Sequence, residues 1–501
     1  MNKEEEVKQL INQAYEKAYE KFQEKKYEIV CVIAEQILKV SPNEWQAMQI
    51  LGLSYSALNR FDDSITILKR CLELNSDNAE TLNDLALAYS GKYDYDNSIK
   101  YLEKAIDVKP DMAVFHSNLG LQYRHKKNND KAIESFKKSI SLSEKPETLA
   151  MLGGCYGEKK QLDEAEKYIL KALELNPNFA AAHVDLSSIL KLQGKWKEGF
   201  SEYEWRSDVY DQLQIWKKIY NPAKKWRGED ISGKRIVIHT EQGHGDAIQF
   251  IRYLKPLKNK GAYIILHCAE SLKSIFSSLA DEFYTNEPNT VANWDVGNNI
   301  PEHDYHCSVM SLPNILQSIF TYYSYIKVDR NFDLSNYKNN KKIGIVWAGN
   351  PQHPNDRERS CRLELFRKIS KIDGVKLFSL MKDTRPRAYK DNGISVDLTI
   401  GSEDIKVVDL CEYINDFEDT ASIINSLDLI ISVDSSVIHL AGAMGKPCFG
   451  LISWNPDWRW EIEGDCTVWY PSVSLVRQKE RGNWDSVFEE VEILVEKFFN
   501  E

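Results

Sequence analysis

The chain has 501 residues, which is too long for one ordinary hydrophobic core, so about two to four domains are expected. Hydrophobic residues make up 43% and charged residues 28%, a balance typical of a folded protein rather than a disordered one. The formal net charge of -11 argues against bulk binding to nucleic acid or to an anionic membrane, because both require a positive field.

Neither a secretory signal nor a membrane span is predicted. Residues 1–8 are charged and lack an apolar core, and no apolar run approaches the roughly 18 residues that a membrane helix needs. The nine cysteines are scattered and form no C-x-x-C pair. We therefore expect reduced thiols in a cytoplasmic protein, rather than disulfides or a zinc site.

A short pattern recurs in the first half of the chain at a fixed interval. The pattern is Leu-Gly/Ala-x-x-Tyr, and it occurs at residues 51–55, 85–89 and 119–123. Both steps are 34 residues, from 51 to 85 and from 85 to 119. This period and this pattern resemble those of tetratricopeptide repeats, each of which is a pair of helices.

Stacked helix pairs form a superhelix whose concave face suits peptide or protein segments. A shortened repeat follows the regular ones, around Gly153 and Tyr156, and degenerate repeats flank the set at 11–42 and 180–206. We therefore assign residues 1–206 to a repeat array that binds a protein partner. Self-association into a homo-oligomer, or a role as a spacer, is the alternative.

The period changes after the array. Residues 207–234 show no clear repeat and are interpreted as a connector. From Arg235 onward, short apolar runs alternate with helical stretches, which predicts βα units and parallel sheets. The apolar runs are 236–238, 263–266, 343–346, 375–380, 429–433 and 448–452.

These runs fall into two groups, each about the size of a Rossmann-like domain. The first domain is placed at 235–340 and the second at 341–501, where residues 483–499 are expected to form a closing helix. Two such domains are expected to face a cleft and to bind a ligand at the carboxyl ends of their strands. We expect residues 207–501 to keep this nucleotide site without the array.

The first candidate site follows the strand predicted at 236–240. Two glycines, Gly243 and Gly245, allow a tight turn that exposes backbone N–H groups to a ligand. Asp246 would stand at the start of the next helix with its side chain in the cleft, while capping of that helix is the alternative. The remaining residues assigned to this acceptor-side loop are Gln242 and His244.

The second candidate site follows the strand that ends at Val433. Ser435 and Ser436 stand at the start of a helix, and hydroxyl groups together with a helix N-terminus form a natural seat for a diphosphate. Such a seat requires no metal. The alternatives are that Asp434 only caps the helix and that His439, one turn later, is a structural histidine.

The third candidate site is the polar loop 347–360, which follows the first strand of the second domain. Gly349 and Asn350 lie at its start and are assigned to the donor site. Arg357 and Arg359 could stabilise the charge that develops on a leaving diphosphate. A solvated surface loop is the alternative.

Taken together, these segments resemble bacterial tetratricopeptide proteins that carry a glycosyltransferase domain of the heptosyltransferase-like kind. The resemblance covers nearly the whole chain and is most specific at 241–250, 347–360 and 419–442, with further likeness at 455–460 and 469–472. It implies a GT-B fold, which is two Rossmann-like domains facing a cleft, and an inverting transfer that needs no metal. The plan of repeats followed by GT-B is also similar to that of the protein O-GlcNAc transferases.

The resemblance also implies roles for single residues. Asp246 would be the base that deprotonates the acceptor. Asp434, Ser435 and His439 would hold the donor. Arg359 is the nearest candidate for the basic residue that helps the diphosphate to leave.

We therefore expect an enzyme that moves a sugar from a nucleotide-sugar to a hydroxyl group, on a protein recruited by the repeats, with no metal or other cofactor. One alternative is a non-catalytic repeat scaffold with a degenerate sugar-nucleotide-binding domain. Others are a glycosyltransferase acting on a lipid-linked or polysaccharide acceptor, and an epimerase built on the same fold.

Overall fold

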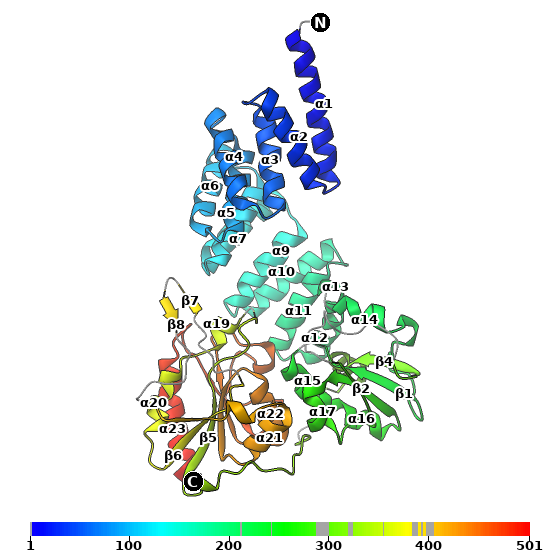
Figure 1. Cartoon of the computed structure of the whole chain (residues 1–501), viewed down its shortest axis with the longest axis vertical. Coiled ribbons are helices and arrows are strands. Elements are labelled where there is room, and N and C mark those ends of the chain that lie inside the picture. Colours follow the sequence, from blue (N-terminus) through cyan, green and yellow to red (C-terminus); the bar gives the residue numbers. More distant parts are fainter. Residues whose placement is uncertain are drawn as a thin grey trace. The chain divides into compact units, whose positions relative to one another are not determined.

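The computed structural model describes residues 3–500, apart from 211–212, 242, 287–299, 319–323, 354, 383–388, 392–393 and 397–404. The chain divides into two compact units, Met1–Asp185 and Leu186–Glu501. The first unit is helical, and the second combines helices with parallel strands (Figure 1). Within the described part of the chain, every helix is too short or too polar to cross a membrane.

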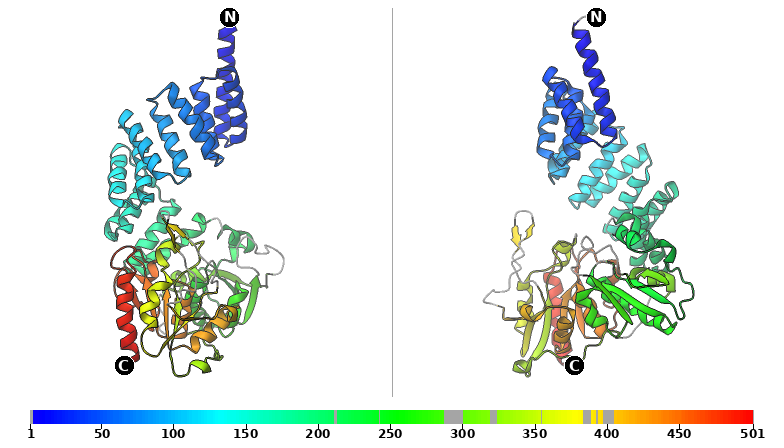
Figure 2. Two further views of the ribbon diagram at one scale, coloured as in Figure 1. Left: turned by 60° about the vertical axis from the view of Figure 1, so that its left-hand side comes forward. Right: turned by 45° about the vertical axis from the view of Figure 1, so that its right-hand side comes forward.

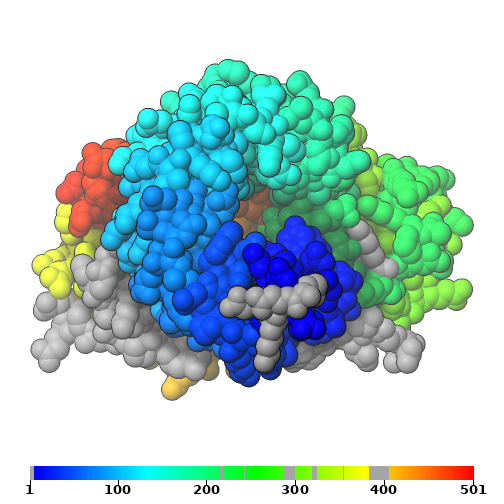
Figure 3. Space-filling model, turned by 90° about the horizontal axis from the view of Figure 1, so that it is seen from above, coloured from blue at the N-terminus to red at the C-terminus, as the bar shows by residue number. Residues whose placement is uncertain are grey.

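Helix pairs follow one another through the first unit. The pairs run along a curved path, coloured from blue to cyan in two further views (Figure 2), and the same colours follow a curve in the space-filling view (Figure 3). The predicted repeat superhelix is therefore confirmed. Its helices are α1 (Lys3–Gln23), α2 (Tyr27–Val40), α3 (Trp45–Ala57), α4 (Phe61–Leu74), α5 (Ala79–Gly91), α6 (Tyr95–Val108), α7 (Ala113–His125), α8 (Asn129–Leu142), α9 (Pro146–Glu158) and α10 (Leu162–Leu175).

The small residue of the repeated pattern lies where two helices touch. A Cβ atom on Gly52 would lie 2.5 Å from Cγ of Leu68, and one on Gly120 would lie 2.8 Å from Cδ1 of Phe136. Ala86 takes the equivalent place in the middle repeat and is fully buried. Since Leu68 lies on α4 and Phe136 on α8, the pattern marks the contact between the two helices of one repeat.

The first sheet of the second unit has four parallel strands among the described residues, in the order β3-β2-β1-β4. The strands are β1 (Arg235–His239), β2 (Tyr263–Ala269), β3 (Glu282–Asn286) and β4 (Tyr305–Ser308). The chain returns to the far side of β1 to form β4, so the strand order reverses there. The accompanying helices are α15 (His244–Phe250), α16 (Leu254–Asn259), α17 (Glu270–Phe276) and α18 (Leu312–Leu316).

The second sheet has six parallel strands in the described ranges, in the order β12-β11-β10-β5-β6-β9. The strands are β5 (Lys341–Val346), β6 (Val375–Ser379), β9 (Val407–Asp409), β10 (Leu429–Val433), β11 (Cys448–Ile452) and β12 (Val473–Arg477). The helices are α19 (Asp356–Arg359), α20 (Arg367–Ser370), α21 (Phe417–Asn425), α22 (Ser436–Met444) and α23 (Asp485–Asn500). A separate antiparallel pair is formed by β7 (Tyr389–Asp391) and β8 (Ile394–Val396). The predicted parallel sheets are thus confirmed.

The segment 186–206, which the sequence placed in the array, belongs to the second unit. It holds the end of α11 (Ala180–Leu192) and α12 (Trp196–Glu202). The ring centroids of Trp196 and Trp469 are 5.4 Å apart, and those of Phe200 and Phe250 are 5.9 Å apart. Because these rings complete the core of the α/β half, that half begins before residue 207.

The predicted connector packs on the first sheet. It contains α13 (Arg206–Val209), α14 (Gln214–Ile219) and the 3-10 turn η3 (Pro222–Lys224). Trp216 and Tyr220 stack on His239 of β1, with ring centroids 4.3 and 5.1 Å away. The Tyr220 hydroxyl also forms a hydrogen bond with Nδ1 of His267 on β2. The segment therefore covers one face of the sheet with aromatic rings.

Candidate functional site

The strand order reverses once in each sheet, between β1 and β4 and between β10 and β5. Open parallel sheets bind ligands at the carboxyl ends of their strands beside such a reversal. The three predicted segments lie at these places, because 240–246 follows β1, 347–360 follows β5 and 434–436 follows β10. The topology therefore brings every predicted segment to a strand end next to a reversal point.

Helices α15 and α22 touch at their first turns. A Cβ atom on Gly245 would lie 2.8 Å from Cδ2 of His439 and 3.7 Å from Cα of Ser436. Gly243 precedes α15 with a φ angle of 75°, a conformation that favours glycine. The two glycines permit a close contact that joins the first predicted segment, from one sheet, to the second, from the other.

Asp246 lies inside the first turn of α15, and Gly243 occupies the capping position before it. The structure therefore does not show the N-cap alternative. The Asp246 carboxylate forms an ion pair with the guanidinium of Arg459, and 33% of the Asp246 side chain is exposed. Arg459 also donates to a carboxylate oxygen of Asp457 at 2.7 Å and to Oε1 of Gln249 at 2.7 Å.

Burial raises the pKa of Asp246 to about 6. The Arg459 guanidinium lowers this pKa, while the carboxylates of Asp457 and Glu241 raise it further. A carboxyl group with a pKa in this range can take up and release protons at the pH where most enzymes work. Asp246 is therefore a candidate for a group that exchanges protons near neutral pH.

Ser435, and not Asp434, caps α22. The Ser435 Oγ accepts a hydrogen bond from the N–H of Val437 at 3.3 Å and lies 3.0 Å from Oγ of Ser432. Ser436 is the first residue of the helix, and both it and Asp434 are partly exposed. The hydroxyl groups predicted for the second site thus stand at the N-terminus of a helix of nine residues.

The loop after β5 is folded back on itself. Arg359 donates from Nε to Oδ1 of Asp356 at 3.3 Å, and Oγ of Ser360 donates to the same oxygen at 3.2 Å. A Cβ atom on Gly349 would lie 2.5 Å from a terminal nitrogen of Arg359. Only 14% of the Arg359 side chain is exposed, so the solvated-loop alternative does not describe it. Asn350 begins a turn with its side-chain oxygen as acceptor.

The charge of Arg359 acts on Asp434 across the ends of β5 and β10. Burial raises the pKa of Asp434 to about 6, Asp457 adds to the increase, and Arg359 opposes it. Charges of both signs therefore meet where the strand order of the second sheet reverses. This is an environment in which a phosphate group finds positive charge and a hydroxyl group finds acceptors.

His439 is buried in the first half of α22. Its Nδ1 lies 2.9 Å from the hydroxyl oxygen of Tyr470, and its ring stacks on Trp460 with centroids 5.2 Å apart. Burial lowers the pKa of His439 well below its ordinary value. These contacts describe a neutral histidine fixed in the core that contacts the first loop at Gly245, and its predicted contact with a donor stays a prediction.

The rest of the first loop has other partners. Glu241 forms an ion pair with Arg206, at the start of α13. The His244 ring lies 5.0 Å from that of Phe417, the first residue of α21. Gln242 lies outside the described residues. The loop is therefore anchored on both sides of Asp246.

Arg459, Asp457 and Gln249 received no role from the sequence alone. All three belong to segments that carry the family resemblance, and the pattern Trp458-Arg459-Trp460 places a charged residue between two large aromatic ones. That pattern could have indicated a buried ion pair, because an arginine flanked by buried rings requires a buried partner. The structure identifies the partner as Asp246.

No group of three or more His, Cys, Asp or Glu side chains in the described ranges is placed to hold a metal ion. The cysteines are free thiols.

The family model described as the tetratricopeptide repeat matches residues 46–78, 79–112, 115–146 and 146–179. The first unit contains tetratricopeptide repeats. Among curated proteins, Protein FlbA of Caulobacter vibrioides is 23% identical over 332 residues, which cover 60% of this chain and 52% of FlbA. The chain thus spans about half the length of that relative.

Two solved structures are also similar to part of the chain. A thermophilic TPR protein of Thermus thermophilus is 24% identical and covers 36% of this chain and 98% of its own, with a TM-score of 0.32. For pilF of Pseudomonas aeruginosa the identity is 17%, the coverage is 41% of this chain and 93% of its own, and the TM-score is 0.37.

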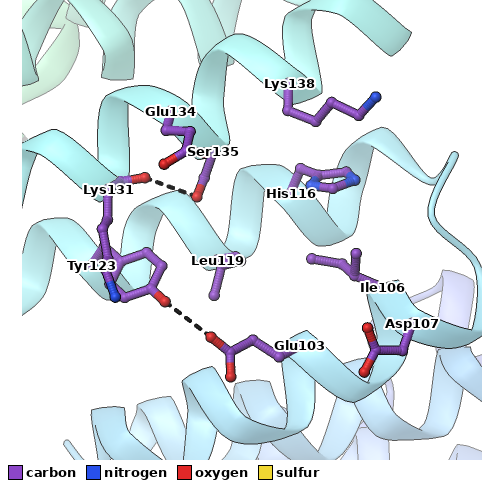
Figure 4. A pocket seen from close by; sticks show the side chains of 10 residues that line it. All are labelled: Glu103, Ile106, Asp107, His116, Leu119, Tyr123, Lys131, Glu134, Ser135 and Lys138. Atoms are coloured by element: carbon purple, nitrogen blue, oxygen red, sulfur yellow. Dashed lines mark hydrogen bonds between the residues drawn. The ribbon is translucent and has the colours of Figure 1, made fainter.

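A hollow of about 390 Å³ opens in the tetratricopeptide array (Figure 4). Tyr123 donates a hydrogen bond to Glu103 at 3.0 Å, and the amine of Lys131 lies 5.2 Å from the Tyr123 ring. Ile106 and Leu119 add apolar surface, so the hollow combines charged and apolar groups. The lining residues, from α6, α7 and α8, are Glu103, Ile106, Asp107, His116, Leu119, Tyr123, Lys131, Glu134, Ser135 and Lys138.

Proposed function

We propose that this chain is an inverting, metal-independent glycosyltransferase with the GT-B fold, in which the two parallel-sheet halves are the two Rossmann-like domains. It transfers a sugar from a nucleotide-sugar to a hydroxyl group on a protein that the tetratricopeptide array recruits. One observation carries the proposal: a carboxyl group with a pKa of about 6, Asp246, stands where α15 of one half meets α22 of the other.

In the proposed reaction, Asp246 accepts the proton of the acceptor hydroxyl while the hydroxyl oxygen attacks the anomeric carbon. The new carbon–oxygen bond forms on one face of the sugar, and the bond to the diphosphate breaks on the opposite face. The nucleoside diphosphate leaves with the bonding electrons, and the configuration at the anomeric carbon inverts. Arg459 orients the carboxylate, and Gln249 and Asp457 orient Arg459.

The departing diphosphate is assigned to the start of α22 and to Arg359. A helix N-terminus presents N–H groups and the positive end of the helix dipole to an anion. Arg359 adds a full positive charge, whose attraction grows as negative charge develops on the leaving group. Ser436 and Gly349, which follow β10 and β5, border this place. The helix N-terminus and Arg359 stabilise the diphosphate directly, so no bridging metal is required.

The acceptor is assigned to a protein because the chain contains tetratricopeptide repeats, whose stacked helices present an extended face suited to peptide segments. The hollow lined by residues of α6, α7 and α8 supports this assignment, since it combines charged and apolar groups. A lipid-linked or polysaccharide acceptor makes the same demands on Asp246 and Arg359 and differs only in what the array contacts.

The test uses the full chain, an extract of the source cells and a panel of radiolabelled nucleotide-sugars. We expect one donor to raise the melting temperature and to label a protein in the extract. A ligand at 100 times its Kd adds about 2.7 kcal/mol of apparent stability. Absence of both effects with every donor would contradict the proposal.

A non-catalytic scaffold is the second candidate, and the presence of tetratricopeptide repeats favours it. A scaffold would bind its protein partner without releasing nucleoside diphosphate. Measuring diphosphate release together with partner binding distinguishes the two candidates. Release of the diphosphate without an acceptor would instead indicate hydrolysis of the donor.

A further inference from the structure

Lys191 is buried in a cage of aromatic rings near the end of α11. None of its surface is exposed. Its amine lies 3.9 Å from the ring centroid of Tyr203, 4.0 Å from that of Trp458 and 5.4 Å from that of Phe200. Among the residues that the structure describes, no hydrogen-bond acceptor reaches this amine.

Such an amine works against stability. Burial lowers the pKa of Lys191 well below its ordinary value, and the positive charge of Arg459 acts in the same direction. A methionine of similar length would fill the same cage without a buried polar group that lacks an acceptor. A residue that costs stability at a fully buried position calls for a reason other than folding.

The cage leads directly to the proposed catalytic carboxylate. The guanidinium carbon of Arg459 lies 4.1 Å from the ring centroid of Trp458, so Lys191 and Arg459 contact the same ring. Asp457 accepts from the backbone N–H of Arg459 at 3.0 Å and from its guanidinium at 2.7 Å. Arg459 in turn forms the ion pair with Asp246.

We propose that Lys191 is a positioning residue of the transfer reaction: it fixes Trp458, and through Trp458 the guanidinium of Arg459 that orients Asp246. The inference rests on the proposed function. It makes the last helix of the repeat region a part of the catalytic machinery, because α11 begins in the first unit and carries Lys191 into the second. A change in α11 on acceptor binding would then act on the catalytic carboxylate.

The test compares Lys191→Met with wild type in the full chain. We expect an equal or higher melting temperature, an unchanged Kd for the nucleotide-sugar, and a kcat lowered about tenfold or more, since a misplacement of ~1 Å can cost ~10²-fold in rate. Lys197→Met, at an exposed lysine of α12, is the matched control and should keep wild-type kcat. A purely structural role would not lower kcat while stability is kept.

A folded Lys191→Met variant with kcat within about twofold of wild type overturns the inference while the proposed function stands. If that variant does not fold, Trp458→Phe replaces it, because phenylalanine keeps a ring in the cage but has a smaller aromatic face than the one that Lys191 and Arg459 both contact. Loss of kcat at unchanged Kd then supports the inference, and loss of both overturns it. If the wild-type protein transfers no sugar, that result contradicts the proposed function and therefore the inference as well.

Discussion

A base must be ionised to accept a proton, and the pKa of about 6 places the ionisation of Asp246 in an easily measured range. As the pH falls below about 6, the protonated fraction grows, so kcat/KM should fall about tenfold per further pH unit. The measurement is the initial transfer rate, at substrate below KM, between about pH 5 and pH 8. A profile that stays flat down to the lower limit would contradict this assignment.

The matched variant for this carboxyl is Asp246→Asn, which keeps the size of the side chain and removes the proton acceptor. We expect kcat to fall by ~10²–10⁴-fold, the usual contribution of a general base, with the Kd for the nucleotide-sugar nearly unchanged. Asp373→Asn, at an exposed position of the second half, serves as control. Near-normal turnover of Asp246→Asn would eliminate it as the base.

Arg359 is expected to act on the leaving group rather than on folding. Arg359→Ala should lower kcat by roughly 10²–10³-fold, because it removes a positive charge aimed at the developing anion. Arg362→Ala changes an exposed arginine that follows the short helix α19 and should leave kcat unaltered.

Because the N-terminus of α22 and Arg359 stabilise the departing diphosphate, activity should survive excess EDTA. Strict dependence on an added divalent ion would refute that view of the donor site.

At the scale of elements, the contact between α15 and α22 leaves no room for a side chain at Gly245. In Gly245→Ala, the new Cβ would lie 2.8 Å from a ring carbon of His439, which Tyr470 and Trp460 hold in place. We expect overpacking to cost about 1–3 kcal/mol and to lower the melting temperature. His439→Ala in the same chain should recover part of that loss, as a double-mutant cycle would show. Additive losses would mean that the two residues do not meet.

The aromatic cover of the first sheet should make it sensitive to acid. Burial lowers the pKa of His267 to about 3 and that of His306 to about 4, and it lowers that of His239 well below its ordinary value. Histidines in the unfolded chain have a pKa near 6.5, so below that pH the unfolded state binds more protons than the folded state. The free energy of unfolding therefore decreases as the pH falls below about 6.5. The raised pKa values of Asp246 and Asp434 act in the opposite direction, between about pH 4 and 6.

A single variant separates the histidine effect from that of the carboxyls. His239→Phe keeps a ring beside Trp216 and Tyr220 and removes one titrating group. We expect its free energy of unfolding, derived from melting curves, to fall less than that of wild type between about pH 7 and pH 5, by a difference on the order of 1 kcal/mol. An identical pH dependence in the two proteins would show that His239 does not titrate differently on folding.

The elements that could be predicted were those whose own residues show a pattern sufficient to form them. The strands β1, β5, β10 and β11 are continuous apolar runs because both faces of a parallel sheet are covered. β3 (Glu282–Asn286) and β9 (Val407–Asp409) are short or partly polar, and they showed no such run. Their place in a sheet depends on a neighbouring strand rather than on their own residues.

The candidate site divides in the same way. Asp246 and Ser435 could be predicted because glycines after a strand indicate a tight turn, and hydroxyl residues after a strand indicate the start of a helix. The ion pair of Asp246 with Arg459 joins residues 213 positions apart, and the cage around Lys191 joins Trp458 to three elements that precede the first sheet. Contacts of this kind are set by how whole elements pack, which no local window of sequence contains.

At the scale of the molecule, the place where the second unit begins decides which truncated chains can fold. Residues 180–501 keep all of α11, and the rings of Trp196 and Phe200 stay with their partners. We expect this chain to bind the nucleotide-sugar and to lose labelling of its protein acceptor. Residues 207–501 lack Trp196, Phe200 and Arg206, the ion-pair partner of Glu241, and should melt at lower temperature or aggregate. Melting curves and labelling assays on both chains check this.

The alternative role of the array is self-association. In that case residues 180–501 would become monomeric and yet label the acceptor at rates comparable to those of the full chain. Light scattering alongside the labelling assay distinguishes this outcome from acceptor recruitment. A smaller mass together with lost labelling would mean that the array serves both purposes.

The aromatic residues at the end of the repeat region also bear on the order in which the chain folds. Repeats form from neighbouring segments and fold quickly, whereas parallel sheets join distant segments and fold slowly. During synthesis from the N-terminus, the array is therefore complete while Trp196 and Phe200 still lack the rings of Trp458 and Trp469. Until those later residues leave the ribosome, Trp196 and Phe200 expose an apolar surface that can associate with other chains. Aggregation of an isolated 1–206 fragment would report on this unfinished surface and not on a native oligomer.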